Sequence, residues 1–352
     1  MPAAAAPPAA LSQDAAPSAV AFGIPLTTRF RCTDVREGLL LRGPAGWGEF
    51  SPFPEYPPAV ASRWLACARE AAEVGWPAPV RRSVPVNVTV PAVDPQQAWA
   101  IVHHSGCATA KVKVAEPGQS LSDDLARVEA VRDALDAVAP AGRIRVDANA
   151  AWSVDQAVTA LRALARFGLE YAEQPVATLA EMALLRRRVD VPLAADESVR
   201  TAEDPLRIAG LEAADIVVLK VQPLGGVRAS LRVAEAVGLP VVVSSAIETS
   251  VGIAAGVALA AALPELPYAC GLATVSLLSR DVVADPLLPV DGVLPVLAAA
   301  DLEVVPQLLA AAALDAEGQA RWTARRSAAE AAGRDGRDGR DGRDGRVNGQ
   351  AT

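Results

Sequence analysis

Lysine, histidine and cysteine are all scarce in this chain of 352 residues. Only three of its 33 basic residues are lysine, two residues are histidine and four are cysteine. The cysteines, Cys32, Cys67, Cys107 and Cys270, form no C-x-x-C pair, a pattern typical of reduced core residues in the cytosol. The two histidines are adjacent in a predicted helix, so we do not expect a zinc site.

Long apolar runs are also missing. The stretch from Val251 to Leu263 is flanked by Glu248 and Glu265 and is too short for a membrane span of about 20 apolar residues. No basic residue precedes Arg29, so the N-terminus lacks the basic region of a signal peptide, and we expect a cytoplasmic protein without a membrane partner. A net charge of −8 argues against a nucleic-acid partner, and 51% hydrophobic residues predict a large core.

The scarcity of lysine makes the three lysines, Lys111, Lys113 and Lys220, informative. Arginine stays protonated in proteins, whereas the pKa of a lysine can be tuned until it loses its proton. Positions that keep lysine against a ten-to-one excess of arginine are therefore candidates for proton transfer. The alternative is that these are surface lysines kept by chance.

The chain divides into five segments by composition and pattern. Residues 1–18 are rich in Ala and Pro, and residues 327–352 contain a repeated Gly-Arg-Asp motif; both are predicted to be disordered. Residues 19–83 contain a hairpin and a helix and are predicted to form an N-terminal capping domain. Residues 84–280 are predicted to form a barrel, and residues 281–326 to complete the cap.

Eight short β-branched runs alternate with amphipathic stretches in the central segment. They cover residues 84–90, 108–115, 143–148, 169–175, 191–198, 215–221, 240–246 and 268–274. This alternation predicts an α/β fold with parallel strands, and eight βα units are the number in a closed barrel. An open doubly wound sheet is the alternative, but the glycine-rich phosphate loop expected after an early strand is missing.

Three acids, Asp147, Glu173 and Asp196, lie where predicted strands end. A predicted helix N-cap follows each of them five or six residues later. These caps are Ser153, Thr178 and Thr201. In a closed barrel the carboxyl ends of the strands form the face that carries active sites, so we expect the three acids to meet there.

The lysines fall around the same face. Lys111 and Lys113 are two residues apart on the second strand, so both side chains point the same way, and Lys220 ends the sixth strand. The second and sixth strands of an eight-stranded barrel lie opposite each other. We therefore expect the lysines to face one another across the barrel mouth, with the acids between them.

This combination of groups suggests a reaction. Three carboxylates without His or Cys predict a site for a hard cation, Mg²⁺, with Mn²⁺ as a substitute. A proton beside a carboxylate becomes removable when a metal stabilises the enediolate that forms, and a lysine near positive charge can be the base. A lysine base with a metal-stabilised enediolate is a known pattern of enolase-superfamily sites.

The chain resembles the enolase superfamily, and within it the muconate-lactonizing subgroup. The matching stretches are TAKVKV, RVDANAAW, YAEQP, AADES, DIVVLKVQPLGG and VVVSSAIETSVGIAAG, which span residues 108–256. Within the subgroup they are most similar to the o-succinylbenzoate synthase family of the actinobacterial type. The resemblance implies a (β/α)7β-type TIM barrel with an α+β capping domain. It also implies a Mg²⁺-dependent dehydration of a small carboxylate in menaquinone biosynthesis.

The resemblance also implies a role for each site residue. Asp147, Glu173 and Asp196 would bind Mg²⁺. Lys113 would abstract the proton and return it to the departing hydroxyl, Lys220 would stabilise the intermediate from the opposite face, and Lys111 would hold Lys113. The supporting and substrate-contacting residues implied are Asn149 and Glu197, and Ser244 and Ser245 at the end of the seventh strand. Gln174 stands where many relatives have Glu, and we expect little effect from it.

Several alternatives stay open. Gly225 and Gly226 precede a helix and would either bind a substrate carboxylate at its N-terminus, which we favour, or only allow a tight turn. Trp47 and Phe50 belong either to a loop over the substrate or to the core. Ser244 and Ser245 together either contact substrate or pack at the rim. An N-acylamino acid racemase, a dipeptide epimerase or a muconate-type cycloisomerase would use the same lysines and metal. A non-catalytic binding barrel is a remote alternative, and the oligomeric state stays undetermined.

Overall fold

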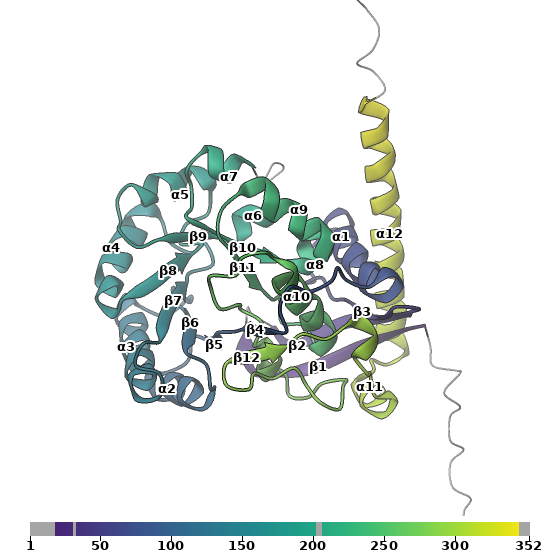
Figure 1. Cartoon of the computed structure of the whole chain (residues 1–352), viewed down its shortest axis with the longest axis horizontal. Helices are drawn as coiled ribbons and strands as arrows, with labels where there is room; N and C mark the ends of the chain where they lie inside the picture. The colour runs from purple at the N-terminus through teal and green to yellow at the C-terminus, as the bar shows by residue number, and fades with distance from the viewer. Residues whose placement is uncertain (1–17, 31–32, 202–205, 345–352) are drawn as a thin grey trace, which may run out of the picture.

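The chain forms an α+β cap beside a parallel barrel (Figure 1). The structure is a computed structural model that describes residues 18–30, 33–201 and 206–344. The predicted N-terminal leader therefore lies outside the described residues, apart from residue 18. Within the described part, no helix is both long and apolar enough to cross a membrane.

The cap begins with an antiparallel sheet. Its strands β1 (Ala19–Phe30), β2 (Thr33–Gly43) and β3 (Gly46–Phe50) pair in this order. The turn between β2 and β3 needs glycine at Gly46, where φ is +142° and a Cβ would lie 2.4 Å from a backbone oxygen. The sheet is followed by α1 (Pro58–Arg69), which continues into a π-helical turn at Glu70–Val74.

Seven parallel strands form the barrel wall and pair in chain order. They are β5 (Val88–Val90), β6 (Thr109–Lys113), β7 (Arg143–Asp147), β8 (Leu169–Glu173), β9 (Leu193–Ala195), β10 (Ile216–Lys220) and β11 (Val241–Ser244). The run at 268–274 is not a full strand. It makes two parallel bridges, Val86 with Cys270 and Ser244 with Gly271, which join the first strand segment to the last and close the barrel. The predicted (β/α)7β barrel with an α+β cap is confirmed.

Helices surround the barrel on its outside (Figure 1). They are α2 (Pro95–His104), α3 (Leu121–Val138), α4 (Val154–Leu164), α5 (Leu179–Arg186), α6 (Glu197–Thr201), α7 (Leu206–Gly210), α8 (Val221–Leu224), α9 (Val227–Val237) and α10 (Ser250–Ala262). The capping boxes predicted at Ser153 and Thr178 are present. The N-cap predicted at Thr201 is wrong, because α6 begins directly after Asp196 and ends at Thr201.

The most apolar helix, α10, lies between the barrel and the cap. All but one of its 13 residues are buried, and it contacts both β11 and β3. A helix that is apolar on every side needs such enclosure on every side. This explains the run from Val251 to Leu263, which is core rather than membrane. Cys67, Cys107 and Cys270 are buried and unpaired, while Cys32 lies outside the described residues.

The C-terminal segment returns to the cap. β12 (Val293–Pro295) pairs with β4 (Ser83–Pro85), and α11 (Pro306–Ala312) contacts β1. The long helix α12 (Ala316–Asp344) packs along α1. The prediction of disorder from residue 327 is wrong for residues 327–344. An Ala-rich stretch continues the helix, Ala329 is fully buried and Glu330 forms an ion pair with Arg69 at 3.0 Å. Residues 345–352 lie outside the described residues.

Candidate active site

A pocket opens at the carboxyl ends of the barrel strands. Barrel residues supply most of its lining, and Phe30 at the end of β1 brings the cap to the same space. The lining residues are Phe30, Thr89, Lys111, Lys113, Asn149, Lys220, Ser244, Ser245, Ala246, Ile247, Gly271 and Thr274. All three lysines of the chain therefore meet in one pocket.

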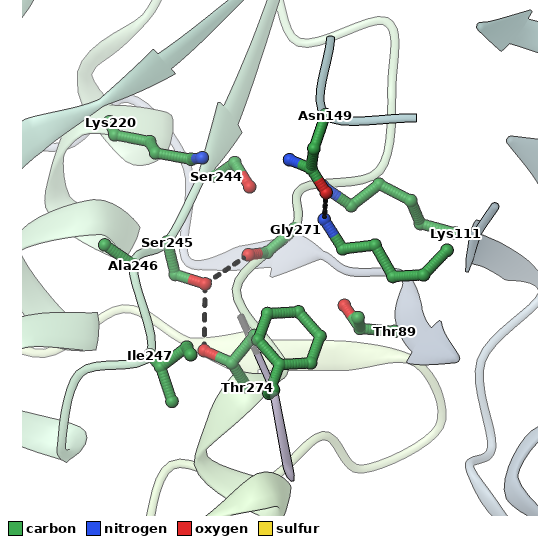
Figure 2. A pocket seen from close by; sticks show the side chains of 12 residues that line it. Thr89, Lys111, Asn149, Lys220, Ser244, Ser245, Ala246, Ile247, Gly271 and Thr274 are labelled. Atoms are coloured by element: carbon green, nitrogen blue, oxygen red, sulfur yellow. Dashed lines mark hydrogen bonds between the residues drawn. The ribbon is translucent and has the colours of Figure 1, made fainter. Parts of the chain in front are cut away.

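The lysines approach the pocket from opposite sides. Lys111 and Lys113 project from the same face of β6, and Lys220 is the last residue of β10. Figure 2 shows the amino groups of Lys220 and Lys111 directed toward the space between them. The predicted opposition of the second and sixth barrel strands is thus present in the structure.

The three acids end the strands between the lysines. Asp147 is the last residue of β7 and Glu173 the last of β8, and their Cα positions pair in register. Asp196 follows β9 directly. All three side chains are at most 1% exposed, so each carboxylate has lost its hydration and needs charged or hydrogen-bonding partners.

The lysines supply those partners. Lys111 Nζ lies 2.9 Å from Glu173 Oε1 and 3.4 Å from Asp147 Oδ2. Lys113 Nζ donates to Asp147 Oδ2 at 2.5 Å, and Lys220 Nζ donates to Asp196 Oδ2 at 2.6 Å. Each of the three carboxylates therefore contacts at least one lysine amino group.

The ion pairs act on the pKa values in opposite directions. Burial lowers the pKa of Lys111, but the carboxylates of Glu173 and Asp147 outweigh it and hold the pKa above its ordinary value. Burial likewise raises the pKa of Asp147, yet Lys113 and Lys111 hold it below its ordinary range. The pKa of Glu173 rises to about 7, because burial and the charge of Asp147 outweigh Lys111. Lys111 is thus a fixed positive charge, and the acids repel one another.

The donor set fits a hard divalent cation. It consists of buried carboxylates without thiol or imidazole. Burial and the charge of Asp147 raise the pKa of Glu173, and a dication would offset this repulsion between the carboxylates. Among the described residues, no three acidic, His or Cys side chains are gathered into a ready ligand cluster. Each of the three acids points instead to a lysine, so metal binding requires these carboxylates to exchange lysine contacts for the cation.

Polar residues behind the acids hold them in place. Asn149 Oδ1 accepts a hydrogen bond from Lys113 Nζ at 2.6 Å, and Asn149 Nδ2 donates to Glu197 Oε1 at 3.3 Å. Gln174 Oε1 accepts from the backbone amides of Asp196 and Ser198 at 3.0 and 3.1 Å. Gln174 is therefore a buried clamp on the loop that carries Asp196, a role that its place beside Glu173 in the sequence did not reveal.

Ser244 and Ser245 both line the pocket. Ser245 Oγ is shared between Gly271 O and Thr274 Oγ1, each at 2.8 Å (Figure 2). Sequence reasoning missed Thr89 and Phe30. The place of Thr89 could have been predicted, because side chains alternate between the two faces of a strand and Thr89 lies on the first barrel strand. That of Phe30 could not, because its ring reaches Lys113 Nζ, 5.2 Å from the ring centroid, only through the packing of cap on barrel.

The predicted anion site at Gly225 and Gly226 is wrong. The carboxylate of Glu70, from the cap, already accepts from the amides of Val227 and Arg228 at the start of α9, at 2.5 and 3.2 Å. A Cβ at Gly226 would lie 2.1 Å from Glu70 Oε2, so glycine allows this close approach. Neither glycine lines the pocket, and the helix terminus joins the cap to the barrel.

Of the two cap residues left open, Phe50 belongs to the core. It is fully buried and packs edge-on against Trp322, with the ring centroids 5.8 Å apart. Trp47 packs against the same core and lies under the guanidinium of Arg42. Neither residue lines the pocket.

Comparison with known families agrees with this geometry. Residues 95–300 match the family described as enolase C-terminal domain-like, and residues 21–72 match the one described as enolase N-terminal domain-like. A muconate lactonizing enzyme from Pseudomonas fluorescens shares the fold, with a TM-score of 0.73 over 84% of this chain and 98% of that one, at 24% identity. The protein is a barrel-and-cap member of the enolase superfamily, whose members use Mg²⁺.

Relatives with higher sequence identity show to which family within the superfamily the chain belongs. The o-succinylbenzoate synthase of Thermobifida fusca is 67% identical over 312 residues, which cover 89% of this chain and 96% of that protein. The o-succinylbenzoate synthase of Mycolicibacterium smegmatis is 56% identical over 78% of this chain and 84% of that protein. This chain belongs to the o-succinylbenzoate synthase family.

Proposed function

We propose that this protein removes water from 2-succinyl-6-hydroxy-2,4-cyclohexadiene-1-carboxylate to give 2-succinylbenzoate, a step of menaquinone biosynthesis. The observation that carries the proposal is the pair of lysine groups on opposite sides of one pocket, above three buried carboxylates. A lysine on one side can transfer a proton while the lysine on the other side stabilises the negative charge that develops. The membership in the o-succinylbenzoate synthase family supplies the substrate.

Lys113 is the proposed base. It takes the proton from the ring carbon that bears the carboxylate, and the electron pair of that C–H bond moves onto the carboxylate to give an enediolate, from which it returns to form the new ring C=C bond when the hydroxyl leaves. Lys113 then gives the proton to the hydroxyl group on the neighbouring carbon as that C–O bond breaks and water leaves. The same lysine can serve both steps because the two groups lie on one face of the ring. The elimination forms an aromatic ring, so little further catalytic power is needed.

The other charged groups of the site would assist this proton transfer. Lys111 stays an ammonium group between Asp147 and Glu173 and supplies a fixed positive charge on the same strand as Lys113. Lys220 would stabilise the negative charge that develops on the opposite face. Mg²⁺, held by Asp147, Glu173 and Asp196, would supply the positive charge that makes the proton beside the carboxylate acidic. Asn149 and Glu197 would orient these groups, and Ser244 and Ser245 would contact the substrate.

The test is an absorbance assay for the aromatic product with Mg²⁺ present. Lys113→Arg keeps the positive charge but cannot lose its proton, so we expect kcat to fall about 10²–10⁴-fold. Arg321→Lys, on the cap surface, is the matched control and should retain full activity. Turnover by Lys113→Arg at the wild-type rate would disprove the assignment of the base.

The facing lysines also suit a second reaction, the racemisation of N-acylamino acids or the epimerisation of dipeptides, which needs one base on each face. The assay is exchange of the α-proton in deuterium oxide. If the protein is a synthase only, exchange should be far slower than dehydration. Rapid exchange that is lost in both Lys113→Ala and Lys220→Ala would establish the racemase activity instead.

A further inference from the structure

One wall of the pocket has a strained backbone. Ala246 and Ile247 follow β11 and line the pocket opposite the β6 lysines. Ile247 has φ of +63°, in the left-handed region that β-branched residues avoid. Such a conformation persists only where the surroundings hold it, so the residues that do so determine the shape of this wall.

A buried arginine of the cap stabilises this strained backbone. Arg36, on β2, is 2% exposed, and its Nε donates to the backbone oxygen of Ile247 at 2.9 Å. Its Nη2 donates to Ser51 Oγ at 3.0 Å, and Ser51 Oγ donates to Glu49 Oε1 at 2.6 Å. Arg36 is thus fixed within the cap at one end and holds the strained carbonyl at the other.

Glu49, on β3, holds the other end of the same loop. It is 2% exposed, and its Oε2 accepts from Thr249 N at 3.0 Å, Thr249 Oγ1 at 2.6 Å and Gly252 N at 3.2 Å. These groups form the start of α10, whose N-cap Thr249 lies two residues after Ile247. Within the loop, Glu248 Oε2 accepts from Ala246 N at 2.7 Å, so the turn is closed on itself as well.

We propose that Arg36, Ser51 and Glu49 are positioning residues that fix the Ala246–Ile247 wall from the cap and thereby set the affinity of the site for its substrate. None of the three lines the pocket. They act through backbone groups of the 246–252 segment and leave the lysines in place. The proposal builds on the proposed function, because it names what shapes the pocket for that substrate.

The test variant is Glu49→Gln. The amide keeps the size of the side chain but has one oxygen in place of two, so it cannot accept from both Ser51 and the start of α10. We expect hydrogen exchange of the amides in residues 246–252 to speed up about ten-fold or more, and KM to rise about ten-fold while kcat changes less than three-fold. A merely structural role would raise exchange throughout the cap and leave KM unchanged.

Glu37→Gln is the matched control. Glu37 is also a cap carboxylate, but its side chain accepts from Arg321 and Trp322, at 2.7 and 2.9 Å, and from no barrel group that the structure describes. This variant should keep both the exchange pattern and KM. If Glu49→Gln fails to fold, Ser51→Ala is used instead. It breaks the link between Arg36 and Glu49, and the same two measurements on it test the positioning role.

The two readouts separate this proposal from the proposed function. Hydrogen exchange is measured on the free protein and needs no substrate. Exchange in residues 246–252 that is unchanged in the folded variants, or a KM equal to that of the wild type, would overturn the positioning role. A wild-type protein that does not dehydrate the cyclohexadiene would overturn the proposed function, while faster exchange in Glu49→Gln would still show that the cap holds this wall.

Discussion

The buried carboxyl group of Glu49 should make the stability of the protein depend on pH. Burial and the nearby charge of Glu248 raise the pKa of Glu49 from 4.5 to about 7, against the opposing effect of Arg36. Between these two values, the folded protein binds a proton that the unfolded chain has already lost. The stability contributed by Glu49 is therefore greatest at low pH, falls as pH rises from about 4.5, and levels off above about 7.

The size of the effect follows from the pKa difference. Each unit corresponds to about 1.4 kcal/mol, so a rise from 4.5 to about 7 corresponds to ~3 kcal/mol in the free energy of unfolding, most of which falls between pH 5 and pH 8. Glu49→Gln cannot titrate and has no such slope. Groups far from Glu49 titrate alike in both proteins, so their contributions cancel in the difference between the two, whereas the interaction of Glu49 with Glu248 is part of the effect that this difference measures.

The measurement is urea unfolding of the wild type and Glu49→Gln at pH 5 and pH 8, monitored by circular dichroism. We expect the wild type to lose about 2–3 kcal/mol relative to the variant between these pH values. Glu37→Gln, at the cap surface, should follow the wild type. Parallel curves for the wild type and Glu49→Gln would refute the inference that Glu49 pays a burial cost when ionised.

Three further outcomes are expected. Gln174→Leu leaves the amides of Asp196 and Ser198 without their acceptor in the core, so the unfolding midpoint should fall by an amount equivalent to about 2–4 kcal/mol. Calorimetry should also show weaker Mg²⁺ binding, and binding equal to that of the wild type would show that the clamp is dispensable. Glu70→Gln removes the charge at the start of α9 and should lower stability by about 1 kcal/mol in urea unfolding, with kcat unchanged, whereas an unchanged midpoint would contradict the role of Glu70 in joining cap to barrel. Chelation with EDTA should abolish turnover and added Mg²⁺ or Mn²⁺ should restore it, while activity that persists in EDTA would contradict the proposed metal.

The barrel and the central part of the site could be predicted because both follow local rules. The alternation of β-branched runs with amphipathic stretches predicts βα units, and the pairing of parallel strands in chain order brings the ends of neighbouring strands to one face. The period of two along β6 places Lys111 and Lys113 on one side. Once the strands were counted, the meeting of lysines and acids followed from geometry.

The sequence could not show how the cap meets the barrel. Gly225 and Gly226 have the local pattern of an anion site, and the anion is Glu70, about 150 residues earlier in the chain. The tail after residue 327 has the composition of a disordered segment, but Ala329 is buried and Glu330 pairs with Arg69 of the cap, so its first part belongs to α12. In each case a contact distant in sequence outweighs the local preference.

The sequence by itself therefore determined the barrel, the three lysines and the three acids, because side-chain periodicity and strand order are properties of neighbouring residues. Only the tertiary structure decided which carboxylate each lysine holds, how Gln174 clamps Asp196, and how Arg36 and Glu49 brace the pocket wall at Ile247. The physical reason is that desolvation and hydrogen bonding act between groups that approach only when the barrel closes and the cap packs on it. Burial then makes each of those contacts specific, because a buried charge or amide must find its partner.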